Sequence, residues 1–200
     1  MGITVFGTSS SGNCHKVRMV LDITGRPYAW REIDVMKDET RTPEFLKLNP
    51  NGKVPVVTLD DGSALAESGA ILWYFGEGTA LIPEDPLQRA RMLQWMFFEQ
   101  YTHEPAIAVA RFILRFLKQP GHKRLPGLQQ RGHEALAVME QHLATHPFFA
   151  GERLSLADLA LFAYTHKAAD GGFDLSVFLA VGRWLDRCRA ERGVSEMPSP

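Results

Sequence analysis

The strongest constraint on the fold is a change of sequence pattern near Asp85. Before this residue, short apolar runs alternate with amphipathic runs in an order that predicts β-α-β-α-β-β-α. After it, apolar residues recur at helical spacing, which predicts about four or five packed helices. A turn-rich stretch, GEGTALIPEDP, separates the two patterns. We therefore predict an α/β domain over residues 1–78, a linker over 79–85 and an all-helical domain over 86–200.

Helix boundaries are predicted by residues that start, stop or interrupt helices. The first helix is expected to begin near Asn13 or Cys14 and to stop at Gly25. Pro105 lies inside a long helical pattern and is expected to bend it, because proline has no amide donor. Further helix starts are indicated by cap residues: Thr42 with Pro43, Ser68, and Ser155 with Asp158 in a capping box.

The charge balance and the cysteine content exclude several classes of protein. The 22 basic and 23 acidic residues leave a net charge of −1, so we expect no nucleic-acid partner and no membrane partner. No apolar run approaches the ~18 residues of a membrane span and no signal peptide is recognisable, so a cytoplasmic location is expected. Cys14 and Cys188 lie near opposite ends of the chain and predict no disulfide framework. No metal site is predicted, because His142 and His146 have no third ligand nearby.

The stretch NGKVPVV is the first candidate binding motif. Its Asn51-Gly52 pair allows a tight turn, and Pro55 directly precedes a predicted strand. A cis bond between Val54 and Pro55 would turn the N–H and C=O of Val54 outward, where they can pair with an extended peptide. The alternative is an ordinary trans-proline turn.

The stretch LAESGAI is the second candidate. Glu67 offers a carboxylate to a ligand ammonium, and Ser68 starts a helix whose first N–H groups suit a ligand carboxylate. Together these groups would clamp an α-amino acid. The alternative is a capped helix with an acidic residue at its start.

The loop TSSSGN, directly before the first expected helix, is the third candidate. A hydroxyl here can donate to a ligand sulfur, and the helix N-terminus favours the anionic form of that sulfur. Lowering a thiol pKa by two units takes about 2.7 kcal/mol. A charge-assisted hydrogen bond gives about 1.5–3 kcal/mol and a helix terminus about 0.3–2 kcal/mol, so two such contacts suffice. The alternative is that Ser9 to Ser11 are turn residues and Asn13 is an N-cap.

Taken in order, these motifs resemble the cytosolic glutathione transferase family, and the resemblance extends over essentially the whole chain. The fragments that carry it are SGNCHKVRMVLDITGRPYAW, TPEFLKLNPNGKVPVV, LAESGAILWYF and GERLSLADLALFAY. The resemblance implies a thioredoxin-like N-terminal domain that binds glutathione and an all-α C-terminal domain that binds an electrophile. It also implies a homodimer, a role in detoxification, and glutathione as cosubstrate with no metal.

The resemblance assigns roles to residues of the first domain. It implies a cis peptide bond before Pro55 and a backbone contact from Val54 to the cysteinyl part of glutathione. Lys53 is expected near the glycyl carboxylate of glutathione. Glu67 and Ser68 are expected to hold the γ-glutamyl end.

The resemblance also limits which residue activates the sulfur. No tyrosine precedes the first helix, so the tyrosine classes of the family are excluded. In the serine classes, which include theta, delta and zeta, the catalytic hydroxyl lies three residues before the position of Cys14, which implies Ser11. Ser9 and Ser10 are alternatives in the same loop and are expected to contact glutathione, while Asn13 is a further candidate donor through its amide. Cys14 is offset by one residue from the family's cysteine position, so we expect a buried, unreactive thiol.

The first long helix of the second domain is expected to supply contacts to the electrophile. Arg111 is expected to orient an anionic substrate, or alternatively to form an ion pair. Glu104 is expected to reach the amino group of glutathione, with an ion pair again the alternative. The full set of expected contacts is Tyr101, His103, Glu104, Ala108 and Arg111.

The function expected from this resemblance is that of a glutathione transferase. The enzyme would activate the thiol of reduced glutathione for attack on a small hydrophobic electrophile. One alternative is a glutathione-dependent thiol–disulfide oxidoreductase or deglutathionylase. Another is a non-catalytic module that binds glutathione or a protein partner.

Overall fold

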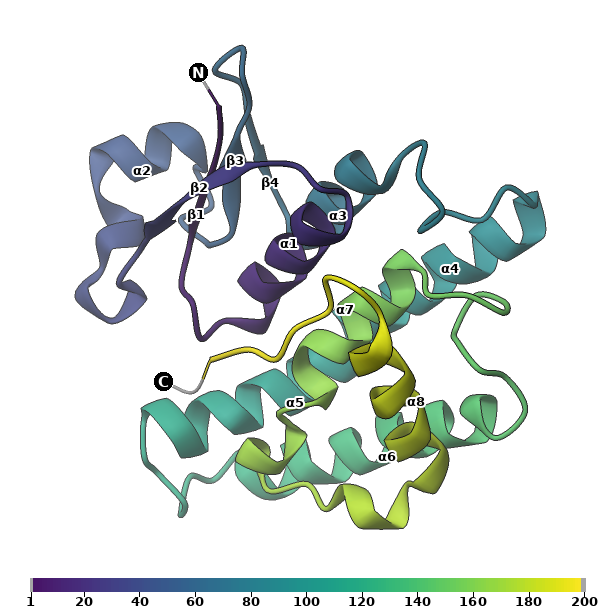
Figure 1. The fold of residues 1–200 in the computed structure, drawn as a ribbon. Helices are drawn as coiled ribbons and strands as arrows, with labels where there is room; N and C mark the ends of the chain where they lie inside the picture. Colours follow the sequence, from purple (N-terminus) through teal and green to yellow (C-terminus); the bar gives the residue numbers. More distant parts are fainter. Residues whose placement is uncertain (1, 199–200) are drawn as a thin grey trace. The chain divides into compact units, whose positions relative to one another are not determined.

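The computed structural model describes residues 2–198, which form two compact units (Figure 1). The chain passes from the first unit to the second between Thr79 and Ala80. The described residues after Arg192 belong to the first unit. The expected helical domain extended to the C-terminus; the difference arises because the last described residues bond to the first unit, where His15 Nε2 lies 2.7 Å from the carbonyl oxygen of Ser195.

A four-stranded mixed sheet forms the centre of the first unit, with the strand order β2-β1-β3-β4. The sheet is mixed because its strand pairs run in different directions: β2 is parallel to β1, whereas β3 is antiparallel to both β1 and β4. The chain order is the predicted β-α-β-α-β-β-α. The elements are β1 (Ile3–Gly7), α1 (Gly12–Ile23), β2 (Tyr28–Glu32), α2 (Pro43–Leu48), β3 (Val56–Thr58), β4 (Ala64–Ala66) and α3 (Ser68–Gly76), with the 3-10 turns η1 (Val35–Lys37) and η2 (Glu39–Arg41) after β2.

Helices cover both faces of this sheet. Figure 1 shows α2 on one side and α1 with α3 on the other. On the α2 side, Phe45 packs with Ile33 and Val56 in one buried cluster. Because side chains alternate along a strand, the neighbouring Val57 points to the other face, and it is fully buried there. The first unit is thus the expected thioredoxin-like α/β domain.

Three helix starts in the first unit test the cap predictions. Thr42 caps α2 as expected, with its hydroxyl accepting from the amide of Phe45 at 3.3 Å and Pro43 at the first helical position. The N-cap of α1 is Ser11, so the alternative with Asn13 as N-cap is wrong. Ser68 is the first helical residue of α3 and Glu67 occupies the N-cap position, so that predicted cap is wrong by one residue.

The second unit is helical, as predicted. Two of its helices are continued by π-helical segments. None of the helices in residues 2–198 is both long and apolar enough to cross a lipid bilayer. The elements are α4 (Pro86–Phe98), η3 (Glu99–His103), α5 (Glu104–Arg111), η4 (Phe112–Phe116), α6 (Leu125–Leu143), α7 (Leu156–Thr165), η5 (Ala168–Gly171), η6 (Leu175–Val177) and α8 (Leu179–Ala190).

Pro105 interrupts the first long helix of this unit, as the sequence predicts. The segment η3 directly before it is π-helical, and the amide of Glu104 bonds to the carbonyl of Glu99, five residues back. Proline has no amide donor and its ring crowds the carbonyl of residue i−4, so a wider turn accommodates it.

The predicted capping box at the start of α7 is present. Both the amide and the hydroxyl of Ser155 donate to Oδ2 of Asp158, at 2.9 and 2.6 Å. The other carboxylate oxygen accepts from the amide of Phe149 at 3.0 Å and from the indole of Trp184 at 2.9 Å. Asp158 therefore ties α7 to α8 and to the loop before α7.

Candidate functional site

The register of the sheet brings the three candidate motifs to one edge. Phe6, near the end of β1, pairs with Val56 at the start of β3, and Val56 pairs in turn with Ala66 at the end of β4. The loop after β1, the turn before β3 and the start of α3 therefore lie at the same edge. This convergence could not be read from the motifs one by one.

Ser11 occupies the N-cap of α1 in extended backbone conformation, with φ −90° and ψ 126°. Its half-buried hydroxyl oxygen accepts from the amide of Cys14 at 3.5 Å, and its own amide donates to the carbonyl of Thr8 at 2.9 Å. Since the oxygen accepts from the helix, the hydroxyl proton is directed elsewhere and suits an acceptor beyond the helix end.

Cys14 lies in the interior of the first unit, where it is 0% exposed. The amide of Thr8 donates to its sulfur at 3.4 Å. Burial raises the pKa of Cys14 to about 11, against the lowering effect of the contact with Ser11. The predicted burial of this thiol is confirmed, and its lack of reactivity stays a prediction. Cys188 is buried too, and burial likewise raises its pKa.

The other two serines of the loop are held differently from Ser11. Ser9 donates both its amide and its hydroxyl to the carboxylate of Glu32, at 2.8 and 2.5 Å. Ser10 is buried, with 9% of its surface exposed. The hydroxyl of Ser9 therefore donates an intramolecular hydrogen bond, whereas Ser11 is the serine at the start of the helix.

Asn13 connects the beginnings of α1 and α3. Its side-chain oxygen accepts from Nζ of Lys16 at 2.8 Å and from the hydroxyl of Ser68 at 3.3 Å. Two donors on one oxygen fix the orientation of the side-chain amide. The structure thus brings two of the predicted site residues, Asn13 and Ser68, into direct contact.

The NGKVPVV motif forms a braced turn. The peptide bond between Val54 and Pro55 is cis. The side-chain amide of Asn49 donates to the carbonyl of Lys53 at 2.8 Å, which holds the turn directly before that bond. Val54 is half-buried and the side chain of Lys53 is exposed.

The backbone at Glu67 has an unusual conformation. Glu67 is exposed and has φ 68° and ψ 114°, a region that non-glycine residues adopt at a cost of about 1–3 kcal/mol. Ser68, directly after it, is only 4% exposed. Strain of this kind is found where the chain must present a group in a fixed direction, which supports a functional role for this corner.

The predicted contacts from the second unit divide into two groups. Tyr101 is 89% exposed, and Glu104 and Ala108 are partly exposed, so all three are accessible to a ligand in this unit. The substrate contacts predicted for His103 and Arg111 need correction, because both side chains lie in the interior.

His103 is fully buried, with Nε2 lying 2.9 Å from the hydroxyl of Thr165 on α7. Arg111 is 3% exposed and forms an ion pair with Asp170 at 3.2 Å, so the ion-pair alternative describes it. Both residues therefore hold the helices of the second unit together.

Metal ligation finds no support in the described part of the chain. Residues 2–198 contain no group of three or more histidine, cysteine or acidic side chains that could hold an ion. The rings of His142 and His146 are stacked with their centroids 4.3 Å apart, and Nε2 of His142 faces the carbonyl of Phe148 at 3.3 Å.

Two residues near the candidate site were missed in the sequence. Lys16 is buried and bonds to Asn13, and its position one helical turn later was the available signal. Glu32 bonds to Ser9 from another strand, and nothing in the spacing of the two residues indicates that contact.

Comparisons with known proteins agree with this geometry. Residues 10–77 match the family model for the N-terminal domain of glutathione S-transferase, and residues 122–190 match the model for the C-terminal domain. Glutathione S-transferase 2 of Anopheles gambiae is 33% identical over 87% of this chain and 84% of its own length. Disulfide-bond oxidoreductase YfcG of Escherichia coli strain K12 is 29% identical over 89% of this chain and 86% of its own length.

Solved structures agree with the whole fold. A glutathione S-transferase from Pseudomonas fluorescens Pf-5 is 44% identical, has a TM-score of 0.96, and matches over 98% of this chain and 99% of that one. A glutathione transferase family member from the same organism, with two glutathione molecules bound, is 25% identical with a TM-score of 0.84, over 96% of this chain and 90% of that one. The motifs, the two folded units and these relatives lead to one conclusion: the chain belongs to the glutathione S-transferase family.

Proposed function

We propose that this protein is a glutathione transferase in which Ser11 activates the thiol of glutathione for attack on a small hydrophobic electrophile. The single observation that carries the proposal is the position of Ser11 at the N-cap of α1, where its oxygen accepts from the helix. The proton of that hydroxyl then suits the sulfur of a bound thiol, and the first turn of the helix adds a positive potential.

The energetic demand on this site is modest. Lowering a thiol pKa by two units takes about 2.7 kcal/mol. A hydrogen bond to a charged sulfur supplies about 1.5–3 kcal/mol, and the N-terminus of α1 adds about 0.3–2 kcal/mol. The thiolate then forms a bond to the electrophilic carbon, and the leaving group departs with the electron pair of the bond that breaks. The thiol proton is released to water when glutathione ionises.

Binding of glutathione is proposed to use the edge of the sheet where the motifs converge. The backbone of Val54 would pair with the cysteinyl part, and Lys53 would lie near the glycyl carboxylate. Glu67 and Ser68 would hold the γ-glutamyl end, and the strained backbone at Glu67 sets the direction in which its side chain leaves the chain. The relative from Pseudomonas fluorescens that contains two glutathione molecules supports this choice of ligand.

Asn13 is proposed as a second donor at the sulfur. Its amide orientation is set by Lys16 and Ser68, so its NH₂ group is held in place before a ligand arrives. The proposal also includes Tyr101, Glu104 and Ala108 as contacts to the electrophile. It further includes a homodimer, which a measurement of the molar mass in solution would test.

Thiol–disulfide exchange is the second candidate function, favoured by the similarity to the disulfide-bond oxidoreductase of Escherichia coli. Both cysteines are buried, so the attacking thiol would come from bound glutathione. That thiolate would attack a mixed disulfide of glutathione, forming glutathione disulfide and releasing the other thiol in reduced form. The mechanism would use the same Ser11 contact, and only the electrophile differs: sulfur in place of carbon.

The decisive experiment is the thiolate absorbance of enzyme-bound glutathione as a function of pH, with S-methylglutathione as the blank. We expect the bound thiol to titrate well below free glutathione in the wild type and near the free value in Ser11→Ala. The matched control is Ser63→Ala, which removes a hydroxyl from the β3–β4 turn.

If the thiol pKa of glutathione bound to the wild type equals that of free glutathione, thiol activation is contradicted. The remaining explanation would then be a non-catalytic module that binds glutathione. An unchanged shift in Ser11→Ala would reject Ser11 as activator. Conjugation of an aryl halide, measured beside reduction of a glutathione mixed disulfide, separates the two candidate functions.

A further inference from the structure

We propose that Glu32, at the end of β2, is a positioning residue that holds the loop between β1 and α1 in the conformation that presents Ser11. The inference rests on the proposed role of Ser11 in thiol activation. Glu32 does not act on the sulfur itself; it acts through Ser9, two residues before the proposed activator.

The carboxylate of Glu32 accepts two hydrogen bonds from one loop residue, Ser9. Oε1 accepts from the amide of Ser9 at 2.8 Å, and Oε2 accepts from its hydroxyl at 2.5 Å. A pair of bonds to the amide and the side chain of the same residue limits both its backbone rotation and its χ1 rotamer. The conformation of Ser9 is therefore set by a side chain from another strand, 23 residues away.

Glu32 is itself held in place and kept ionised. The indole of Trp30 donates to its Oε2 at 2.7 Å, and the guanidinium of Arg18 lies 4.2 Å from the centre of the Trp30 ring. Although partial burial raises the pKa of Glu32, the donors on Ser9 and Trp30 lower it below its usual value. Because Arg18 belongs to α1, the cluster connects the end of β2 to the helix that Ser11 caps.

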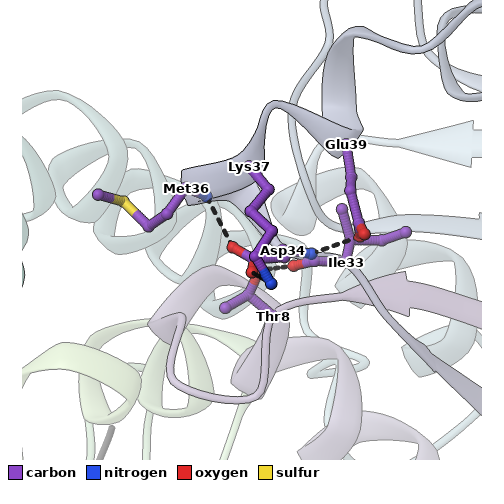
Figure 2. A network of polar contacts seen from close by, with 6 residues as sticks. All are labelled: Thr8, Ile33, Asp34, Met36, Lys37 and Glu39. Atoms are coloured by element: carbon purple, nitrogen blue, oxygen red, sulfur yellow. Dashed lines mark hydrogen bonds and ion pairs between the residues drawn. The ribbon is translucent and has the colours of Figure 1, made fainter.

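A second set of bonds fixes the beginning of the same loop independently of Glu32. The hydroxyl of Thr8 donates to the carbonyl of Ile33 at 2.6 Å (Figure 2). The amide of Ile33 donates to the carbonyl of Gly7 at 2.9 Å. Figure 2 also shows how the chain after Ile33 is anchored: the amide of Asp34 donates to Glu39 at 2.7 Å, and its carboxylate pairs with Lys37 at 3.1 Å.

This division of contacts predicts a selective effect. Without Glu32, the bond from Thr8 to Ile33 still holds the start of the loop beside the end of β2. We therefore expect the fold and the start of the loop to persist. Ser9 would lose both of its restraints, and the hydroxyl of Ser11 would sample other positions. Glu32 is exposed, so its removal opens no cavity in the core.

The test measures the thiol pKa of bound glutathione in Glu32→Ala and Glu32→Gln. We expect Glu32→Ala to raise it by about one unit, which is about a tenfold loss of thiolate below that pKa. The rate of conjugation at saturating glutathione should fall by a similar factor. Glu32→Gln keeps an acceptor oxygen for Ser9 and should recover part of the shift. The matched control is Glu44→Ala, which removes an exposed carboxylate from the first turn of α2.

The outcomes separate this inference from the proposed function. If Ser11→Ala raises the thiol pKa and Glu32→Ala leaves it unchanged, the positioning role is wrong while Ser11 stands. If Ser11→Ala leaves the thiol pKa unchanged, the proposed role of Ser11 as activator is wrong, and the positioning role of Glu32 that rests on it is wrong as well. If Glu32→Ala is poorly folded by circular dichroism, Glu32→Gln and Ser9→Ala replace it, and a thiol pKa equal to wild type in both overturns the inference.

Discussion

Loss of Asp158 is predicted to destabilise the second unit strongly. It is 0% exposed and its two oxygens accept four hydrogen bonds, two from Ser155 and one each from Phe149 and Trp184. In Asp158→Ala the hydroxyl of Ser155 can rotate to another acceptor, but three N–H donors lose theirs. Each buried donor without an acceptor costs about 1–3 kcal/mol, and such costs are not additive within one network.

We therefore expect Asp158→Ala to lower the free energy of unfolding by about 3–5 kcal/mol, a large share of the ~5–15 kcal/mol of a typical domain. Asp158→Asn keeps one acceptor oxygen and should cost about half as much. The assay is urea unfolding followed by circular dichroism and by tryptophan fluorescence. The control is Asp186→Ala, whose carboxylate is 79% exposed in an ion pair with Arg189. Equal losses in Asp158→Ala and Asp186→Ala would refute the reasoning.

The remaining predictions concern the two buried cysteines and the C-terminal segment of the first unit. Because burial raises the pKa of Cys14 from 9.0 to about 11, its protonated form stabilises the fold below pH 9, and this contribution is lost between pH 9 and 11. Native protein should resist a disulfide reagent at pH 8 and react at Cys14 and Cys188 only when unfolded; rapid labelling would contradict the burial. Gly193→Ala should lower the thermal midpoint by a few degrees, because Gly193 has φ 88° and an added Cβ would lie 2.9 Å from the amide nitrogen of Ile23. An unchanged midpoint would show that the C-terminal segment adjusts freely.

Features set by neighbouring residues were predictable from the sequence. The Thr42 cap with Pro43, and the capping box of Ser155 with Asp158, depend on residues at most three positions apart. An interruption of the helix near Pro105, observed as a π-helical segment, needs no information beyond the missing amide donor. Each of these signals works through the local backbone, so the rest of the fold had no means to override it.

The start of α1 was harder to place, because Ser11 and Asn13 are both good N-cap residues. Packing decides between them. With Ser11 as cap, Cys14 turns into the core, where its sulfur lies 3.0 Å from the position that a Cβ on Gly7 would take. That contact joins a helix to a strand, and a pattern of helix propensities holds no information about it. The bond from Ser9 to Glu32 was unpredictable for the same reason, since a half-buried serine in a loop and an exposed glutamate on a strand each have many possible partners.

The double role of Ser11 affects how its substitution is interpreted. Its oxygen accepts from the amide of Cys14 and, in the proposed mechanism, its proton goes to the sulfur. Ser11→Ala therefore removes a helix cap, worth about 0.5–2 kcal/mol, together with the sulfur contact. A loss of activity alone would not separate these two effects. The thiol pKa of bound glutathione separates the changes at the sulfur from the loss of folded protein, because unfolding lowers the amount of folded protein without changing the titration of the glutathione that remains bound. A pKa that returns to the free value can therefore be attributed to the lost contact and the altered helix end at the sulfur, and not to unfolding.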